Sequence, residues 1–257
     1  MLKRGGAHEY NSNQVLRGFQ MKAVLNFIQD KKQDFAQLPL FEFMKDSKID
    51  PRIRLSFAPC GAHFVMSFAD LNKYVFREYP PSNQLQELIN SHTYEDDHHL
   101  VWFLEDLEKL GFSHSLSFPD ALRFLWGEQT KHTRQLSYRL AGYALQAKPL
   151  QKLIVIETIE ALGNVFFSCT TQVALELQEI TKQEYRYFGN VHLNVEKGHT
   201  TGTSEVDKLL EDIQLTEETR KEAFELVEKV FQVFTELVNE LLEYAKTHQI
   251  SPLIQAS

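Results

Sequence analysis

Residues 85–110, LQELINSHTYEDDHHLVWFLEDLEKL, form the stretch that decides the fold class. Apolar residues recur in it at intervals of three and four, which is the spacing of one face of an α-helix. Pro80 and Pro81 end any earlier helix, Ser82 is a suitable N-cap and Gly111 a suitable stop, so we predict one helix of almost thirty residues. Its inward face is apolar at both ends and polar in the middle, and comprises Leu85, Leu88, Ile89, His92, Asp96, His99, Phe103, Leu107 and Leu110.

The polar centre of this face has a counterpart later in the chain. Both segments contain a histidine, an acid four residues on, and a second histidine three residues after that. The triplets are His92, Asp96 and His99 in HTYEDDHH, and His192, Glu196 and His199 in HLNVEKGH. Positions i, i+4 and i+7 share one helix face, so each triplet can converge on one point. A single match is common on solvated helix faces, but two matches that interrupt apolar stripes favour metal binding.

Imidazole and carboxylate ligands suit a divalent iron, manganese, cobalt, nickel or zinc ion. Two triplets on facing helices predict two such ions, and a carboxylate from a third helix would reduce the repulsion between them. The segment LIVIETIEALGNVFF, residues 153–167, offers Glu157 or Glu160 in an otherwise almost wholly apolar window. Buried acids are usually paired or bound to metal, so one of the two is a predicted ligand, and the sequence leaves the choice open.

The remaining apolar patterns are also helical. We expect helices at about residues 15–37, 59–77, 119–145, 150–177, 182–199 and from Thr216 onward. No alternating segment is long enough for a sheet, and neither an internal repeat nor a domain boundary is evident. The sequence therefore predicts a single all-α domain, residues 1–257, of about seven helices.

Composition narrows the function. The net charge is −8, so the chain lacks the excess of basic residues that is typical of a nucleic-acid-binding protein. No nucleic-acid partner is therefore expected. Cys60 and Cys169 cannot form a disulfide framework or a four-cysteine zinc site. No apolar run approaches the ~18 residues of a membrane span, and the first residues lack the apolar core of a signal peptide, so we expect a cytoplasmic protein without a membrane partner.

With these motifs in place, the chain resembles the haem-oxygenase-like diiron oxidases and oxygenases, which share the fold of haem oxygenase and of the TenA-type proteins. The resemblance covers about residues 15–242, and its specific part is the late triplet, in which Glu196 stands where the family usually has aspartate. His92 stands where the early helix of the family has glutamate, and Asp96 can supply that carboxylate. The resemblance implies a single haem-oxygenase-like bundle with two iron ions per chain, although manganese or another divalent metal would also suit the ligands.

The resemblance also implies what the chain does. It predicts a non-haem dimetal oxidase or oxygenase that uses O₂ on a small metabolite, and the family commonly forms homodimers, which the apolar stripe of the last helix allows. Haem is not expected, because the chain has no histidine between His8 and His63 to ligate it at the start of the first helix. Three alternatives stay open: a metal-independent or cysteine-dependent TenA-like enzyme, a non-enzymatic helical binding or regulatory protein, and a metal-dependent hydrolase.

Two further expectations concern the substrate. Arg134 or Arg139, in the helix predicted from residue 119, could hold a substrate carboxylate, although a surface helix explains both cations as well. Aromatic residues near the clusters would make the pocket largely apolar; they are Trp102, Phe103, Phe166, Phe167, Tyr185, Tyr187 and Phe188.

Overall fold

The computed structural model describes residues 19–113, 116–200 and 210–248, with the side chains of residues 196–200 left out. Helices dominate these ranges, as predicted. They are α1 (Lys22–Phe35), α2 (Pro39–Lys45), α3 (Pro51–Arg54), α4 (Ala62–Leu71), α5 (Gln84–Asp96), α6 (Leu100–Lys109), α7 (Phe118–Leu125), α8 (Lys131–Ala144), α9 (Pro149–Thr181), α10 (Asn190–Thr200) and α12 (Glu217–Thr247).

Short elements join them. The 3₁₀ turns η1 (Ala58–Gly61) and η3 (Glu128–Thr130) precede α4 and α8, and the π-helical turn η2 (Asn72–Phe76) follows α4. The only strands in the described residues are β1 (Phe19–Gln20) and β2 (Gln214–Leu215), which form one two-residue antiparallel pair. The all-α prediction is therefore confirmed.

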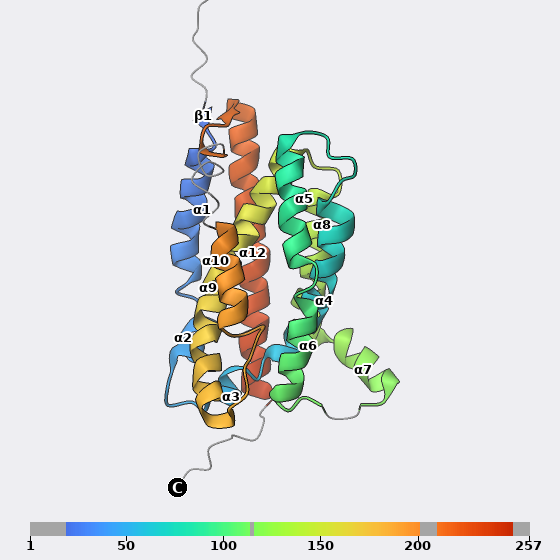
Figure 1. Cartoon of the computed structure of the whole chain (residues 1–257), viewed down its shortest axis with the longest axis vertical. Helices are drawn as coiled ribbons and strands as arrows, with labels where there is room; N and C mark the ends of the chain where they lie inside the picture. The colour runs from blue at the N-terminus through green and yellow to red at the C-terminus, as the bar shows by residue number, and fades with distance from the viewer. Residues whose placement is uncertain (1–18, 114–115, 201–209, 249–257) are drawn as a thin grey trace, which may run out of the picture.

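Helix α9 is the centre of the molecule. It contacts α1, α2, α3, α5, α8, α10 and α12, and most helices run along the long axis of the molecule around it (Figure 1). α9 is long and apolar enough to cross a membrane by length and composition, contrary to the prediction that no run approaches that length. However, 67% of its most apolar window is buried against neighbouring helices, and the burial accounts for the apolar composition.

Several predicted helices are shorter than expected. The helix predicted over residues 119–145 is divided into α7, η3 and α8, because the Thr130 hydroxyl lies 2.9 and 3.0 Å from the carbonyls of Phe124 and Leu125 and can donate to them at the end of α7. Short α7 contains no buried residue and projects from the bundle (Figure 1). No helix was predicted between residues 37 and 59, but this segment contains α2, which buries Leu40, Phe41 and Met44.

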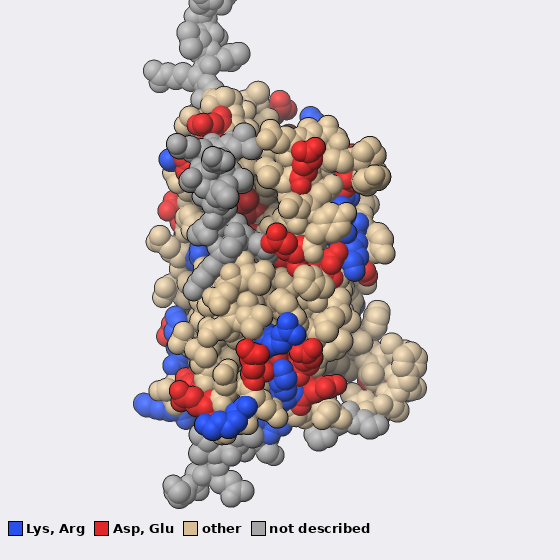
Figure 2. All heavy atoms as spheres, viewed as in Figure 1, with Lys and Arg blue, Asp and Glu red and all other residues tan. Residues whose placement is uncertain are grey.

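Charged side chains of both signs are intermixed over the face of the molecule shown in Figure 2. Exposed ion pairs of the molecule include Lys22–Glu211, at 2.9 Å, and Arg123–Asp120, at 2.6 Å. Such exposed pairs contribute little to stability, so the interior must hold the fold together. That interior is one cluster of buried apolar residues reaching from Met21 to Ala245.

Candidate metal centre

The predicted long helix over residues 82–111 is in fact two helices. α5 begins after the N-cap Asn83, whose side chain accepts from the amide of Gln86 at 3.0 Å, and ends at Asp96. A turn over residues 97–99 then leads into α6. Aspartate is a weak helix former, and the Arg77 guanidinium stabilises the turn by donating to Asp97 Oδ2 and to the Thr93 carbonyl. His92, Asp96 and His99 therefore do not share one continuous helix face.

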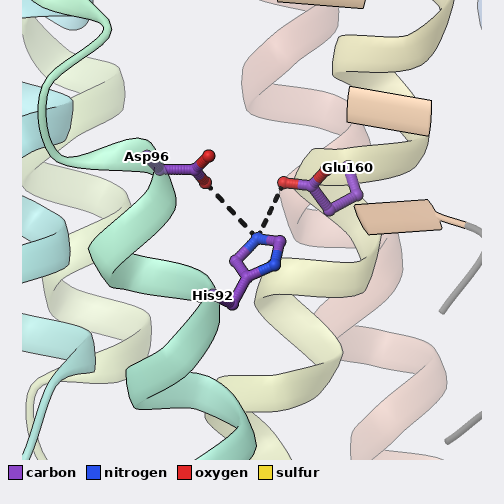
Figure 3. A group of neighbouring side chains, drawn as sticks. All are labelled: His92, Asp96 and Glu160. Carbon is purple, nitrogen blue, oxygen red and sulfur yellow. Dashed lines mark hydrogen bonds and ion pairs between the residues drawn. The ribbon is translucent and has the colours of Figure 1, made fainter. Parts of the chain in front are cut away.

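Even so, the first two of these residues meet Glu160 of α9 (Figure 3). His92 Nε2 lies 3.0 Å from Glu160 Oε1 and 3.3 Å from Asp96 Oδ2. One ligand atom from each side chain lies within 4.8 Å of the other two. Asp96 and Glu160 are buried, and His92 is largely so, which gives the group a water-poor setting.

The electrostatics of this group suit a divalent cation. Burial lowers the pKa of His92, but the hydrogen bonds and charges of Asp96 and Glu160 outweigh burial and raise the pKa of His92 to about 11. A divalent ion bound among these three side chains would compensate the charges of both carboxylates. Loss of the His92 proton would free Nε2 as a ligand, so these residues fit a metal ion.

Two histidines lie beside this group. His99, at the start of α6, and His192, in the first turn of α10, are both buried, and their ring centroids are 4.4 Å apart. His99 Nδ1 also lies 3.8 Å from Asp96 Oδ1 and connects the two halves of the site. Trp102 stacks on the His99 ring at 4.6 Å, and Phe167 lies against His192 at 3.8 Å, so both rings are held by aromatic neighbours.

The orientation of His192 is fixed by one backbone group. Its Nδ1 lies 3.0 Å from the carbonyl oxygen of Tyr187. A carbonyl can only accept, so Nδ1 carries the hydrogen, and in neutral His192 the lone pair is on Nε2. Metal-binding histidines are commonly held in this way through the nitrogen that does not bind the metal.

Tyr187 is held in turn by Asp106, which was not among the predicted site residues. The buried Asp106 carboxylate accepts from the amides of Arg186, Tyr187 and Phe188 at 3.0, 2.8 and 3.1 Å. The Tyr187 peptide thus donates to Asp106 and accepts from His192. Burial raises the pKa of Asp106, while the amides that it accepts from and nearby Lys109 lower it.

Asp106 also explains why residues 182–189 are not helical, contrary to prediction. The three amides that it binds belong to a loop between α9 and α10. α9 ends at Thr181, and Lys182, which caps it, has the left-handed conformation. A Cβ on Gly189 would lie 2.1 Å from the Tyr185 carbonyl oxygen, so the chain needs glycine there. No sequence signal separates Asp106 from the less buried acids of α6, Glu105 and Glu108, apart from its place between Phe103 and Leu107.

A cavity opens beside the polar group. The volume that the centres of water-sized molecules can occupy in it is about 110 Å³. Its lining includes Asp96, His99, Glu160 and His192. Most of the remaining wall is apolar and rich in phenylalanine. Five of the seven predicted pocket aromatics contribute to the wall: Phe103, Phe166, Phe167, Tyr187 and Phe188. Tyr185 is buried elsewhere in the core, and Trp102 reaches the site through His99.

Comparison with known proteins supports the fold. No known protein-family profile matches the chain, and no curated protein matches it. A crystal structure of a domain of unknown function with a haem-oxygenase-like fold, from Shewanella denitrificans OS217, aligns with a TM-score of 0.61 over 89% of this chain and 94% of that one, at 14% sequence identity.

The chain has a haem-oxygenase-like fold. Within this haem-oxygenase-like bundle, the structure separates the two candidate acids of α9. Glu160 is buried, reaches His92 and lines the cavity, whereas Glu157 is half-buried and is not one of the lining residues within the described part of the chain. Glu196 and His199 belong to α10, but their side chains lie outside the described residues.

The two candidate substrate-binding arginines contact other parts of the bundle. Arg134 donates to the carbonyl of Leu125 at 3.0 Å, where it joins α8 to the end of α7. Arg139 donates to Glu236 of α12 at 2.6 Å. Neither lines the cavity in the described part of the structure, so the geometry favours a structural role for both.

Proposed function

We propose that this protein is a non-haem dimetal oxidase or oxygenase that uses O₂ on a small metabolite, with iron as its metal. The observation that carries the proposal is the buried group of His92, Asp96 and Glu160 at the wall of an apolar cavity. Burying two carboxylates beside a cavity is costly unless a cation compensates them. The candidate ligands include both nitrogen and oxygen atoms, a combination that suits iron. Magnesium and calcium prefer sites made of oxygen atoms alone.

The residues divide into two sets in this proposal. His92, Asp96 and Glu160 would hold one ion, and His99 and His192, with Glu196 and His199 of the same α10 helix, would hold the other. Bound iron would supply the redox chemistry and the binding of O₂. The protein would hold the ligands in place through the Asp106–Tyr187–His192 contacts, and the aromatic wall would exclude water from the reacting groups.

A cysteine-dependent enzyme is disfavoured by the environment of both thiols. Burial and the charge of Glu240 raise the pKa of Cys60 to about 12, and its Sγ donates to the Gln129 carbonyl at 3.2 Å. Burial also raises the pKa of Cys169. A reactive cysteine needs a lowered pKa, so neither residue has the setting of a nucleophile.

Metal loading tests the proposal. We expect the purified protein to bind about one to two iron(II) ions per chain under anaerobic conditions, as measured by elemental analysis after gel filtration. On exposure to air, the loaded protein should take up O₂ faster than the same concentration of free iron(II), and prior chelation should abolish this uptake.

Each alternative gives a different result. A helical binding protein, or a metal-independent enzyme, would bind no ion at saturating iron, manganese and zinc. A hydrolase would bind zinc and turn over substrates without O₂. Either result would overturn the assignment as an oxidase or oxygenase.

Two adjacent histidines provide a matched test of the second ion. The His99 side chain is only 7% exposed and lines the cavity, whereas that of His98 is 55% exposed. His99→Ala should remove about one ion from the iron stoichiometry, while His98→Ala should bind iron as the parent does. Circular dichroism would establish that both variants fold. Equal iron binding by the two variants would exclude His99 as a ligand.

A further inference from the structure

The residues of the cavity wall indicate which chemical groups the cavity can accept. Away from the polar group, aromatic rings from five parts of the chain surround the space: Phe35 of α1, Phe57 before η1, Phe64 and Phe68 of α4, Phe166 of α9 and Phe234 of α12. Phe57 meets Phe166, and Phe64 meets Phe234, edge to face. The wall therefore offers both ring faces and ring edges to a guest molecule, which suits an aromatic or alkyl group.

Among the described lining residues, charge is confined to one region of the wall. The charged and imidazole groups there are Asp96, His99, Glu160 and His192, and they contact one another directly or through His92. No lysine or arginine lines the cavity within the described ranges. A carboxylate or phosphate placed among the phenylalanines would thus find no lysine or arginine among the described lining residues to compensate its burial.

We infer that the substrate places an uncharged aromatic ring or short alkyl group in this cavity, with any polar atom restricted to the end formed by Asp96, Glu160, His99 and His192. The inference rests on the proposed function, because it assigns the cavity to the substrate. The available volume of about 110 Å³ is close to that of apolar protein cavities that accept benzene, at about 150 Å³. The inference replaces the expectation that an arginine captures a substrate carboxylate.

Binding of two probes of the same ring size tests the inference. Toluene is uncharged and benzoate is anionic, and both would be titrated into the full chain by ligand-observed NMR, first after chelation and then after iron loading. We expect toluene to bind the chelated protein and benzoate to bind it at least tenfold more weakly. Benzoate binding as tightly as toluene to the chelated protein, or no binding of toluene, would overturn the inference.

Matched glycine variants show whether the probe occupies this cavity. Gly61 lines the cavity, and a Cβ added there meets nothing within 4 Å, so Gly61→Leu has room to fill it. Gly142 is equally open but exposed on α8, so Gly142→Leu is the control. Ala69→Leu fills the cavity from a second, buried position.

We expect Gly61→Leu and Ala69→Leu to weaken toluene binding at least tenfold and Gly142→Leu to change it less than twofold. Parent-like binding by both filling variants would overturn the inference. Because the titration of the chelated protein needs no metal, its outcome is separate from that of the metal-loading test. A protein that binds toluene but no metal would contradict the proposed function alone.

Discussion

Glu160→Gln should reduce iron(II) affinity by at least about 100-fold, beyond the ~10–100-fold loss typical of residues that only support a ligand. The substitution keeps the size of the side chain and its ability to hydrogen-bond to His92, but it removes one of two buried negative charges. With a single carboxylate left, the group would balance only one of the two positive charges of a divalent ion. An anaerobic competition titration against a chromophoric chelator measures the change.

Glu157→Gln is the matched control. It makes the same chemical change on the same helix, three residues earlier, at a half-buried position that does not line the cavity in the described structure. We expect its iron affinity to stay within a few-fold of that of the parent. If Glu157→Gln reduced the affinity as much as Glu160→Gln, the choice of Glu160 as the ligand would be wrong.

Asp106→Asn should lower the free energy of unfolding by about 3 kcal/mol, because charged hydrogen bonds are lost and buried amides lose their acceptor. The three amides of residues 186–188 converge on two carboxylate oxygens. Asparagine has one oxygen, and its NH₂ group would face a donor. For a chain of this size the loss corresponds to a fall in melting temperature of roughly 6–12 °C, measurable by circular dichroism.

Glu105→Gln gives the comparison for Asp106. Glu105 is the preceding residue, its side chain is 41% exposed, and its carboxylate is 3.7 Å from Arg186 and 4.0 Å from Lys109. Surface pairs of this kind contribute ~0–1 kcal/mol, so the melting temperature of this variant should barely change. Iron affinity should fall in Asp106→Asn only, because His192 is held through Tyr187. Equal melting temperatures for the two variants would show that Asp106 does not hold this loop.

Local signals predicted some helices well. Thr216 caps α12, the helix predicted from Thr216 onward, by accepting from the amide of Thr219 at 3.1 Å, and the apolar stripe that follows is buried. The predicted helix over residues 150–177 corresponds to α9, which begins with Pro149 in its first turn. Caps and 3.6-residue periodicity involve residues within a few positions of one another, so the sequence alone suffices to predict them.

Breaks in helices were not predicted, since they depend on distant partners. The turn at residues 97–99 is stabilised by Arg77, and the loop before α10 is held by Asp106, about eighty positions earlier. Both segments have helical composition when considered alone. A hydrogen bond to a distant carboxylate or guanidinium outweighs the weak local preference there.

By itself, the sequence determined the all-α class and the residue types of the candidate site, because both follow from local spacing and from the chemistry of histidine and carboxylate. Only the tertiary structure decided that Glu160 rather than Glu157 meets His92, a contact between residues 68 positions apart. The tertiary structure also orients His192 through Tyr187 and Asp106, and it brings phenylalanines from at least five parts of the chain around one cavity. These features depend on how helices pack against one another, and packing is set by the sum of many long-range contacts rather than by any short stretch of sequence.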